Sequence, residues 1–247
     1  MKTLRIPLAA VASLTLALPL FAKTTTWTAG TTYKTDKVAK SFLDPKNWDN
    51  GVPEPGDTVV ITGTSNWDNP IYIGHEGGAT DTAETFDFGD KGLTLETVAN
   101  VSCAVSFTGT GVLTKRGAGT LTTTAQSTLT GGMLIEDGGV LAASGSGAAY
   151  GSSSCGPLVL KKGKNVENAP WLKASSYGCR IFNPVRIVDG DTANGGPSFA
   201  GLDYVPQTTG AFTIEDDCIV SAQNMTMQIP SISGAGHTVT LEHRAIN

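Results

Sequence analysis

The chain has 247 residues, of which 40% are hydrophobic and 16% are charged, and its formal net charge is −5. The hydrophobic content is enough to fill a continuous core, and the 30 glycines favour a structure of strands and turns. The acidic balance argues against a nucleic-acid partner, because phosphate backbones bind basic surfaces.

The first 22 residues have the pattern of a secretory signal peptide. Lys2 and Arg5 form a short positive segment, an apolar run follows from Ile6 to Phe21, and Ala22 is the small residue expected before a cleavage site. The run is shorter than the roughly 20 residues that cross a bilayer as a helix, so we expect export rather than anchoring. Loss of Lys2 and Arg5 with the leader takes the formal charge from −5 to −7.

Residues 23–56 are predicted to cap the N-terminal end of a solenoid. The first coil of a solenoid has no preceding neighbour, so large side chains have to cover its exposed end. We expect Trp27, Phe42 and Trp48 to do this. An aromatic sugar-binding platform is the alternative, but no repeated spacing of aromatic residues supports it.

Short apolar or β-branched runs separated by turn residues predict strands from residue 57 onward. The first five runs are Thr58–Thr62, Ile71–Ile73, Phe86–Phe88, Leu93–Leu95 and Val101–Phe107. His75 and Glu76 lie in a corner loop and are residue types that bind metals, although a solvated pair is the more common outcome.

The region from Gly109 to Ala142 contains four further runs, and its apolar residues repeat at about 20 residues. The runs are Val112–Thr114, Leu121–Thr124, Met133–Ile135 and Val140–Ala142. Leu113 recurs as Leu134 and Leu121 recurs as Leu141, which predicts that these leucines stack in adjacent coils. Glycines between the runs are expected to supply the positive φ angles of the corners: Gly109, Gly111, Gly117, Gly119, Gly131, Gly132, Gly138 and Gly139.

One motif fills this central region: Gly109-Thr-Gly111-Val-Leu113-Thr-Lys115-Arg-Gly117-Ala-Gly119-Thr-Leu121-Thr, then Thr130-Gly131-Gly132 and Asp137-Gly138-Gly139-Val140-Leu141. It resembles the autotransporter-associated β-strand repeat, also called the passenger-associated transport repeat. A second, partial copy begins at Ile232-Ser-Gly234-Ala-Gly236-His-Thr-Val-Thr-Leu241. The segment around Trp27 and Trp48 is similar to the opening segment of passenger β-helices in the same family. The resemblance implies a right-handed parallel β-helix that bacteria display or secrete, with no catalytic residues attached.

After the repeat, strands are predicted to alternate with polar or irregular stretches. Residues 143–156 are rich in Ser, Gly and Ala, Lys161–Gly178 is interpreted as an excursion, and Asp189–Gly210 is the longest insertion. Long loops tend to carry function or to be disordered, so we expect the first and last of these stretches to contact a partner. The remaining strands are predicted at Leu158–Leu160, Ile181–Val188, Phe212–Ile214, Ile219–Ser221, Met225–Ile229 and Thr238–Leu241. Asp189-Gly-Asp191 hints at calcium, but the spacing of a calcium loop is absent, which favours a polar turn.

The four cysteines, Cys103, Cys155, Cys179 and Cys218, would meet an oxidising space after export. Their spacing fits no Cys-x-x-Cys metal motif, and four cysteines allow three pairings. We favour a Cys155–Cys179 bond, because it would close a loop of about 24 residues around an irregular stretch. The alternative is that one or more of the cysteines stay buried and reduced.

Glu215-Asp216-Asp217 is the best place for a pair of catalytic carboxylates. In a strand, Glu215 and Asp217 would share one face while Asp216 opposes them, and glycan-cleaving enzymes use carboxylates held a few ångströms apart. The spacing is generic. The three histidines, His75, His237 and His243, and Ser153 fit no nucleophile motif. We therefore expect no enzyme, no cofactor and no metal site.

These observations predict an all-β chain, a single-stranded right-handed parallel β-helix with residues 1–22 as signal peptide, 23–56 as cap and 57–247 as the helix. The expected function is a structural or adhesin-like passenger on the bacterial outer surface, with glycans or proteins of a host or neighbouring cell as partners. The alternatives are a polysaccharide-active lyase or hydrolase and a fragment of a larger passenger without a role of its own. Because no polar cap closes the last coil, we expect the helix to be incomplete at its C-terminus.

Overall fold

A computed structural model describes residues 22–29, 41–63, 70–74, 84–142, 155–161, 170–174, 180–188, 199–203, 207–208, 210–223, 231–234 and 236–244. These residues are all-β apart from one 3-10 helix, η1 (Pro45–Asn47). In the first half, the strands are β1 (Thr24–Thr26), β2 (Thr58–Ile61), β3 (Ile71–Ile73), β4 (Thr85–Asp87), β5 (Leu93–Thr97), β6 (Val101–Cys103), β7 (Ser106–Gly109), β8 (Leu113–Arg116), β9 (Thr120–Thr123), β10 (Thr128–Leu129), β11 (Met133–Ile135) and β12 (Gly138–Ala142). The others are β13 (Leu158–Lys161), β14 (Pro170–Ala174), β15 (Arg180–Ile181), β16 (Val185–Val188), β17 (Phe199–Asp203), β18 (Gln207–Thr208), β19 (Phe212–Ile214), β20 (Cys218–Gln223), β21 (Ile232–Ser233) and β22 (Val239–Arg244).

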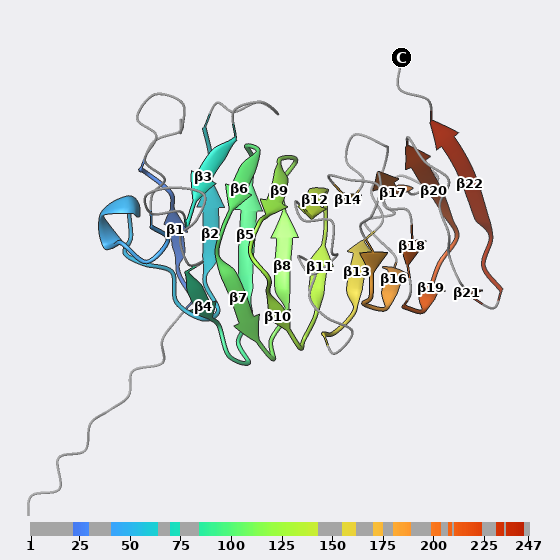
Figure 1. Cartoon of the computed structure of the whole chain (residues 1–247), viewed down its shortest axis with the longest axis horizontal. Helices are drawn as coiled ribbons and strands as arrows, with labels where there is room; N and C mark the ends of the chain where they lie inside the picture. The colour runs from blue at the N-terminus through green and yellow to red at the C-terminus, as the bar shows by residue number, and fades with distance from the viewer. Residues whose placement is uncertain are drawn as a thin grey trace, which may run out of the picture.

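The strands stack along the long axis of the molecule, from β1 at one end to β22 at the other (Figure 1). One sheet has nine strands in the order β1-β2-β5-β8-β11-β13-β16-β19-β21, and a second has eight in the order β3-β6-β9-β12-β14-β17-β20-β22. Two shorter sheets are β4-β7-β10 and β15-β18. Neighbouring strands in these sheets run parallel, and from β2 onward each coil gives one strand to each long sheet in turn. The predicted stacked parallel architecture is therefore confirmed as a β-solenoid arrangement.

The core includes inward-facing rows that cross the nine-stranded sheet, one residue per coil. The first row is almost entirely aliphatic, and every member is at most 2% exposed: Leu93, Leu113, Met133, Leu158, Val185 and Phe212. The next inward row contains Val59, Leu95, Lys115, Ile135, Leu160, Ile187 and Ile214. Stacking removes these side chains from water, and the burial of apolar surface stabilises the fold by roughly 25 cal/mol per Å².

The predicted stacking partners in the central repeat are wrong by one residue. Leu113 pairs with Met133, and Leu134 pairs with Thr114 on the outward row. In the second sheet, Leu121 pairs with Val140. A shift of one residue exchanges the two faces of a strand, so Met133 is 1% exposed while Leu134 is only half-buried. Methionine is unbranched and fills an irregular gap well, which explains how it can replace a leucine in the row.

The corner glycines have two roles. Some supply the predicted positive φ angles, and others allow the backbones of adjacent coils to approach closely. Gly117 has φ +87°, as a left-handed turn position requires. Gly131 needs no positive φ, but a Cβ added there would lie 2.6 Å from the Gly111 carbonyl carbon of the preceding coil. Glycine is required at such a position because the backbones of adjacent corners approach closely.

The aromatic residues predicted for the cap form a buried cluster near the N-terminus. Trp27, Phe42 and Trp48 are each at most 5% exposed, and the ring of Trp48 packs edge-to-face on the other two with centroid distances of 4.9 and 5.2 Å. The Trp48 Nε1–H donates to the Phe42 carbonyl at 2.8 Å. Because these rings are buried against each other, they offer no flat exposed face for a sugar.

Several segments differ from the strand predictions. Residues 101–107 form two strands, β6 and β7, with a corner at Ala104 and Val105, and residues 181–188 are divided in the same way into β15 and β16. The expected excursion Lys161–Gly178 contains β14, and the expected insertion Asp189–Gly210 contains β17 and β18. β14 and β17 are integral to the eight-stranded sheet, so these stretches are not simple loops. The predicted strand at 225–229 and the stretch 143–154 lie outside the described residues.

Candidate functional site

The predicted carboxylate pair lies at a corner, not on a strand. Glu215, Asp216 and Asp217 form a bend between the end of β19 at Ile214 and the start of β20 at Cys218. The alternation of side chains along a strand does not apply to a bend, so the prediction that these three residues lie in a strand is wrong.

Glu215 is held by an arginine of the preceding coil. Arg186, on β16, approaches it with two nitrogens, at 2.5 Å from Nε to Oε1 and 2.9 Å from Nη2 to Oε2. The hydrogen bond from Arg186 lowers the pKa of the Glu215 carboxyl, and the same bond raises the pKa of Arg186. A general acid needs a raised pKa to keep its proton near neutral pH, so this contact opposes that role for Glu215.

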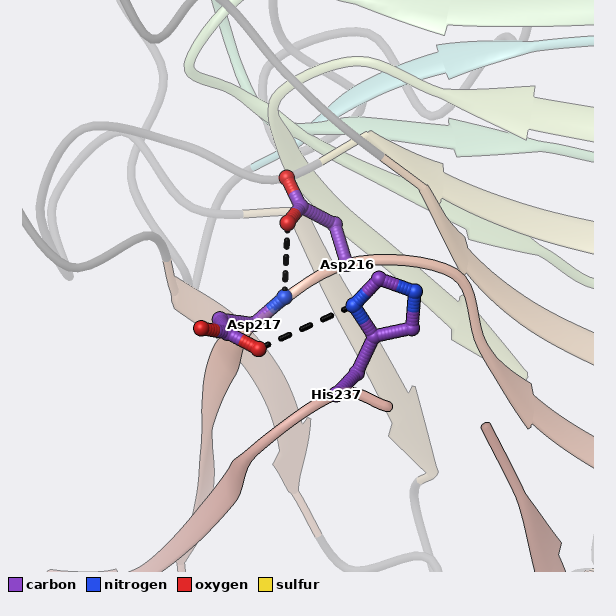
Figure 2. Close-up of side chains that lie close together, drawn as sticks. All are labelled: Asp216, Asp217 and His237. Carbon is purple, nitrogen blue, oxygen red and sulfur yellow. Dashed lines mark hydrogen bonds and ion pairs between the residues drawn. The ribbon is translucent and has the colours of Figure 1, made fainter. Parts of the chain in front are cut away.

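Asp216, Asp217 and His237 gather where the corner meets the next coil (Figure 2). Asp217 Oδ1 lies 3.7 Å from His237 Nδ1 and accepts a hydrogen bond from the Thr238 amide at 2.7 Å. Asp216 Oδ1 accepts from the Asp217 amide at 2.8 Å.

The three side chains each offer one ligand atom, and these atoms lie within 4.8 Å of one another. Carboxylates and an imidazole are groups that divalent cations accept. However, the Asp217 side chain is 68% exposed, and exposed acidic groups of this kind occur widely without a metal. We assign the corner a structural role, in which Asp217 connects the turn before β20 to the turn before β22.

A buried lysine that the sequence did not single out lies inside the coil stack. Lys115 is 0% exposed and occupies an inward row between Leu95 and Ile135. Its Nζ donates to the carbonyls of Arg116 at 3.2 Å, Gly117 at 2.5 Å and Asp137 at 3.0 Å. The amine therefore ties the corner after β8 to the corner after β11.

Burial lowers the pKa of Lys115 to about 8, and the negative charge of Asp137 opposes this shift. Asp137 Oδ1 is buried and has no hydrogen-bond partner. Desolvation favours a neutral amine, which a protein can use as a nucleophile. Here the amine is covered by its own corners and bonded to three carbonyls, so the geometry supports a structural function. In the sequence, the sign that Lys115 is buried is its distance of 20 residues from the apolar Ile135. This spacing indicates burial only once the register of the coils is known.

The other predicted candidates divide between described and undescribed residues. Cys103 is a buried free thiol, and burial raises its pKa to about 12. Cys155 and Cys218 are also buried. Six candidates lie outside the described residues: His75, Glu76, Ser153, Cys179, Asp189 and Asp191. Because Cys179 is one of them, the Cys155–Cys179 disulfide stays a prediction. For His243, in β22, the described part is the backbone.

A scan against protein-family models, a search of curated proteins and a search of solved structures each returned no match to this chain. The resemblance to the autotransporter-associated repeat therefore rests on the residues of the sequence. Among the helices of the described residues, none has the length and hydropathy of a membrane-spanning segment.

Proposed function

We propose that this chain is a secreted or surface-displayed structural protein, a right-handed parallel β-helix that holds adhesive loops and catalyses no reaction. The observation that carries the proposal is the uninterrupted stacking of nine parallel strands in one sheet, with an aromatic cluster at its N-terminal end. Such a stack is extended and rigid, because each coil is bonded to its neighbours along the axis. These are the properties of a stalk.

Contacts on the outside of the stack also support a passive role. Arg116 Nη2 lies 2.6 Å from Glu96 Oε2, and Lys161 Nζ lies 3.3 Å from Glu136 Oε1. Each of these ion pairs joins neighbouring coils along the nine-stranded sheet, with its two residues on a strand or directly after one. The pairing of Arg186 with Glu215 does the same, so these charged side chains are used between coils.

The location and partners in this proposal come from the sequence. The leader predicts export, and the repeat motif resembles that of autotransporter passengers on the outer surface of bacteria. Partners would be glycans or proteins on a host or neighbouring cell. Loops between the strands are the natural contact points, since the strands themselves are engaged in the stack.

Binding by a loop-replacement variant tests the adhesive role. Residues 143–154 are replaced by a Gly/Ser linker of equal length, and the matched control replaces residues 162–169 in the same way. We expect the purified chain to bind a glycan array or intact cells, and we expect the 143–154 variant to lose binding at an unchanged melting temperature. Equal binding by the variant and the intact chain would remove this stretch from the proposal.

A cleavage assay on acidic polysaccharides tests the non-catalytic role. We expect no shortened products from the purified chain. Cleavage that disappears in the double variant Glu215→Gln, Asp217→Asn would show that the chain is a polysaccharide-active enzyme instead.

A further inference from the structure

The backbone of Lys23 enters the coil stack directly beside a carboxylate. Its nitrogen donates a hydrogen bond to Asp57 Oδ1 at 2.8 Å, and its carbonyl accepts one from the Thr58 amide at 2.9 Å. Lys23 thus joins the parallel ladder of β1 and β2 one residue before β1 begins. Ala22, on the other side of the peptide bond, is exposed. The predicted leader ends at this bond.

Asp57 is in a position where a negative charge is costly. The residue is 2% exposed, and its Oδ2 accepts the Glu54 amide at 2.7 Å. Lys23 Nζ lies 4.0 Å from this oxygen and 3.6 Å from Glu54 Oε1, so the side-chain cation is shared between two carboxylates. A buried carboxylate requires an opposite charge as well as hydrogen bonds. This cluster of two anions and one cation carries one negative charge in excess.

We propose that removal of the leader completes this site, because the freed α-ammonium of Lys23 forms an ion pair with Asp57. An export peptidase hydrolyses the Ala22–Lys23 bond: water adds across the amide, the leader departs with a carboxylate on Ala22, and the Lys23 nitrogen is left as an ammonium. The nitrogen keeps its contact with Asp57 Oδ1 and changes from a neutral donor into a cation. The Asp57 carboxylate already accepts a charge-assisted hydrogen bond from this nitrogen, and a positive charge on the donor adds a direct attraction between the two charges. Processing therefore balances the charge of the cluster and fastens β1 to β2.

A double-mutant cycle tests the pair in the processed chain. Chains that begin at Lys23, or that carry a Gly-Ser-Ala22 extension, are each made with Asp57 or with Asp57→Asn. The equilibrium constant of urea unfolding is then measured. Removing the extension should stabilise the Asp57 chain about tenfold, which corresponds to about 1.4 kcal/mol, and should change the D57N chain by less than about twofold. Equal effects in both backgrounds would overturn the proposal.

The variant Lys23→Gln separates the α-ammonium from the side chain. It removes Nζ and leaves the terminal nitrogen in place, so the coupling between the free terminus and Asp57 should persist. Disappearance of the coupling in this variant would mean that Nζ alone neutralises Asp57, which contradicts the proposal.

A second measurement uses the folded proteins only. In the chain that begins at Lys23, acylation of the α-amine at neutral pH should be about tenfold slower with Asp57 than with D57N, because an ion-paired amine is held protonated. Equal acylation rates would overturn the pairing.

The proposal depends on the predicted signal peptide but not on the adhesive role. Mass analysis of the exported chain tests the cleavage site independently of any binding. We expect its first residue to be Lys23; a mature chain that begins at Thr24 or later would lack the nitrogen and refute the inference, whatever the chain binds.

Discussion

Burial of Lys115 makes a specific prediction about how stability depends on pH. The pKa of this amine is about 8 in the folded chain, below its ordinary value of 10.5. Between these two values the unfolded chain binds more protons than the folded chain, so the free energy of unfolding rises with pH. Below pH 8 the charged amine is buried at a cost, and that cost disappears as the pH rises toward 10.5.

The size of the effect follows from the two pKa values. Their difference corresponds to about 3 kcal/mol in all, of which about 2.5 kcal/mol falls between about pH 7 and about pH 10. The variant Lys115→Met keeps an unbranched side chain of similar length and removes the titrating group. The free energy of unfolding of the native chain, minus that of K115M, should therefore increase by about 2.5 kcal/mol over this range.

Urea unfolding of both proteins at a series of pH values measures this difference, and groups titrating equally in both proteins cancel. Lys91→Met is the matched control, because Lys91 is exposed, and its curve should run parallel to that of the native chain. A flat difference for K115M would show that burial does not lower the pKa of Lys115. A difference that falls with pH would show that the three carbonyls favour the charged amine more strongly than burial opposes it.

Three further predictions concern packing and charge. Gly131→Ala should lower the free energy of unfolding in urea by about 1–3 kcal/mol, since the added Cβ meets the backbone of the preceding coil. The control Gly89→Asn, at φ +57° in open space, should lower it by less than about 1 kcal/mol. Equal losses would contradict the close approach of the corners. Trp48→Ala should lower the free energy of unfolding by about 3–5 kcal/mol, because it leaves a cavity in the aromatic cluster. A loss below about 1 kcal/mol would show that the cluster is not closely packed. Arg186→Gln should cost at most about 1 kcal/mol at low salt and nothing measurable at high salt, because the pair with Glu215 is exposed; a salt-independent loss would show another role for Arg186.

The repeat period and the kind of sheet could be predicted from the sequence because glycine pairs and apolar runs recur at a nearly constant spacing. The register could not. Leu113 has a leucine 21 residues later and a methionine 20 residues later, and matching like with like selects the wrong one. The difference depends on how many residues the corner takes up, and the pattern of apolar residues does not specify that number.

The same limit applies to Lys115 and to the insertions. A lysine in a run Leu-Thr-Lys-Arg predicts a solvated side chain, because burying an amine costs free energy unless acceptors surround it. Those acceptors include the carbonyl of Asp137, which is 22 residues away. Likewise, Phe199–Asp203 is too rich in small residues to be recognised as a strand. The eight-stranded sheet includes it because β14 and β20 lie on either side.

The stacking register itself can be measured most directly through its hydrogen bonds. The amide of Glu136 donates to the carbonyl of Lys115 at 2.9 Å, in the same ladder that places Leu113 beside Met133. A scalar coupling across that hydrogen bond, observed by NMR between the Glu136 nitrogen and the Lys115 carbonyl carbon, is the result we predict. A coupling of the Lys115 carbonyl to the amide of another residue, or an antiparallel pattern of couplings between these segments, would contradict the stacked parallel coils.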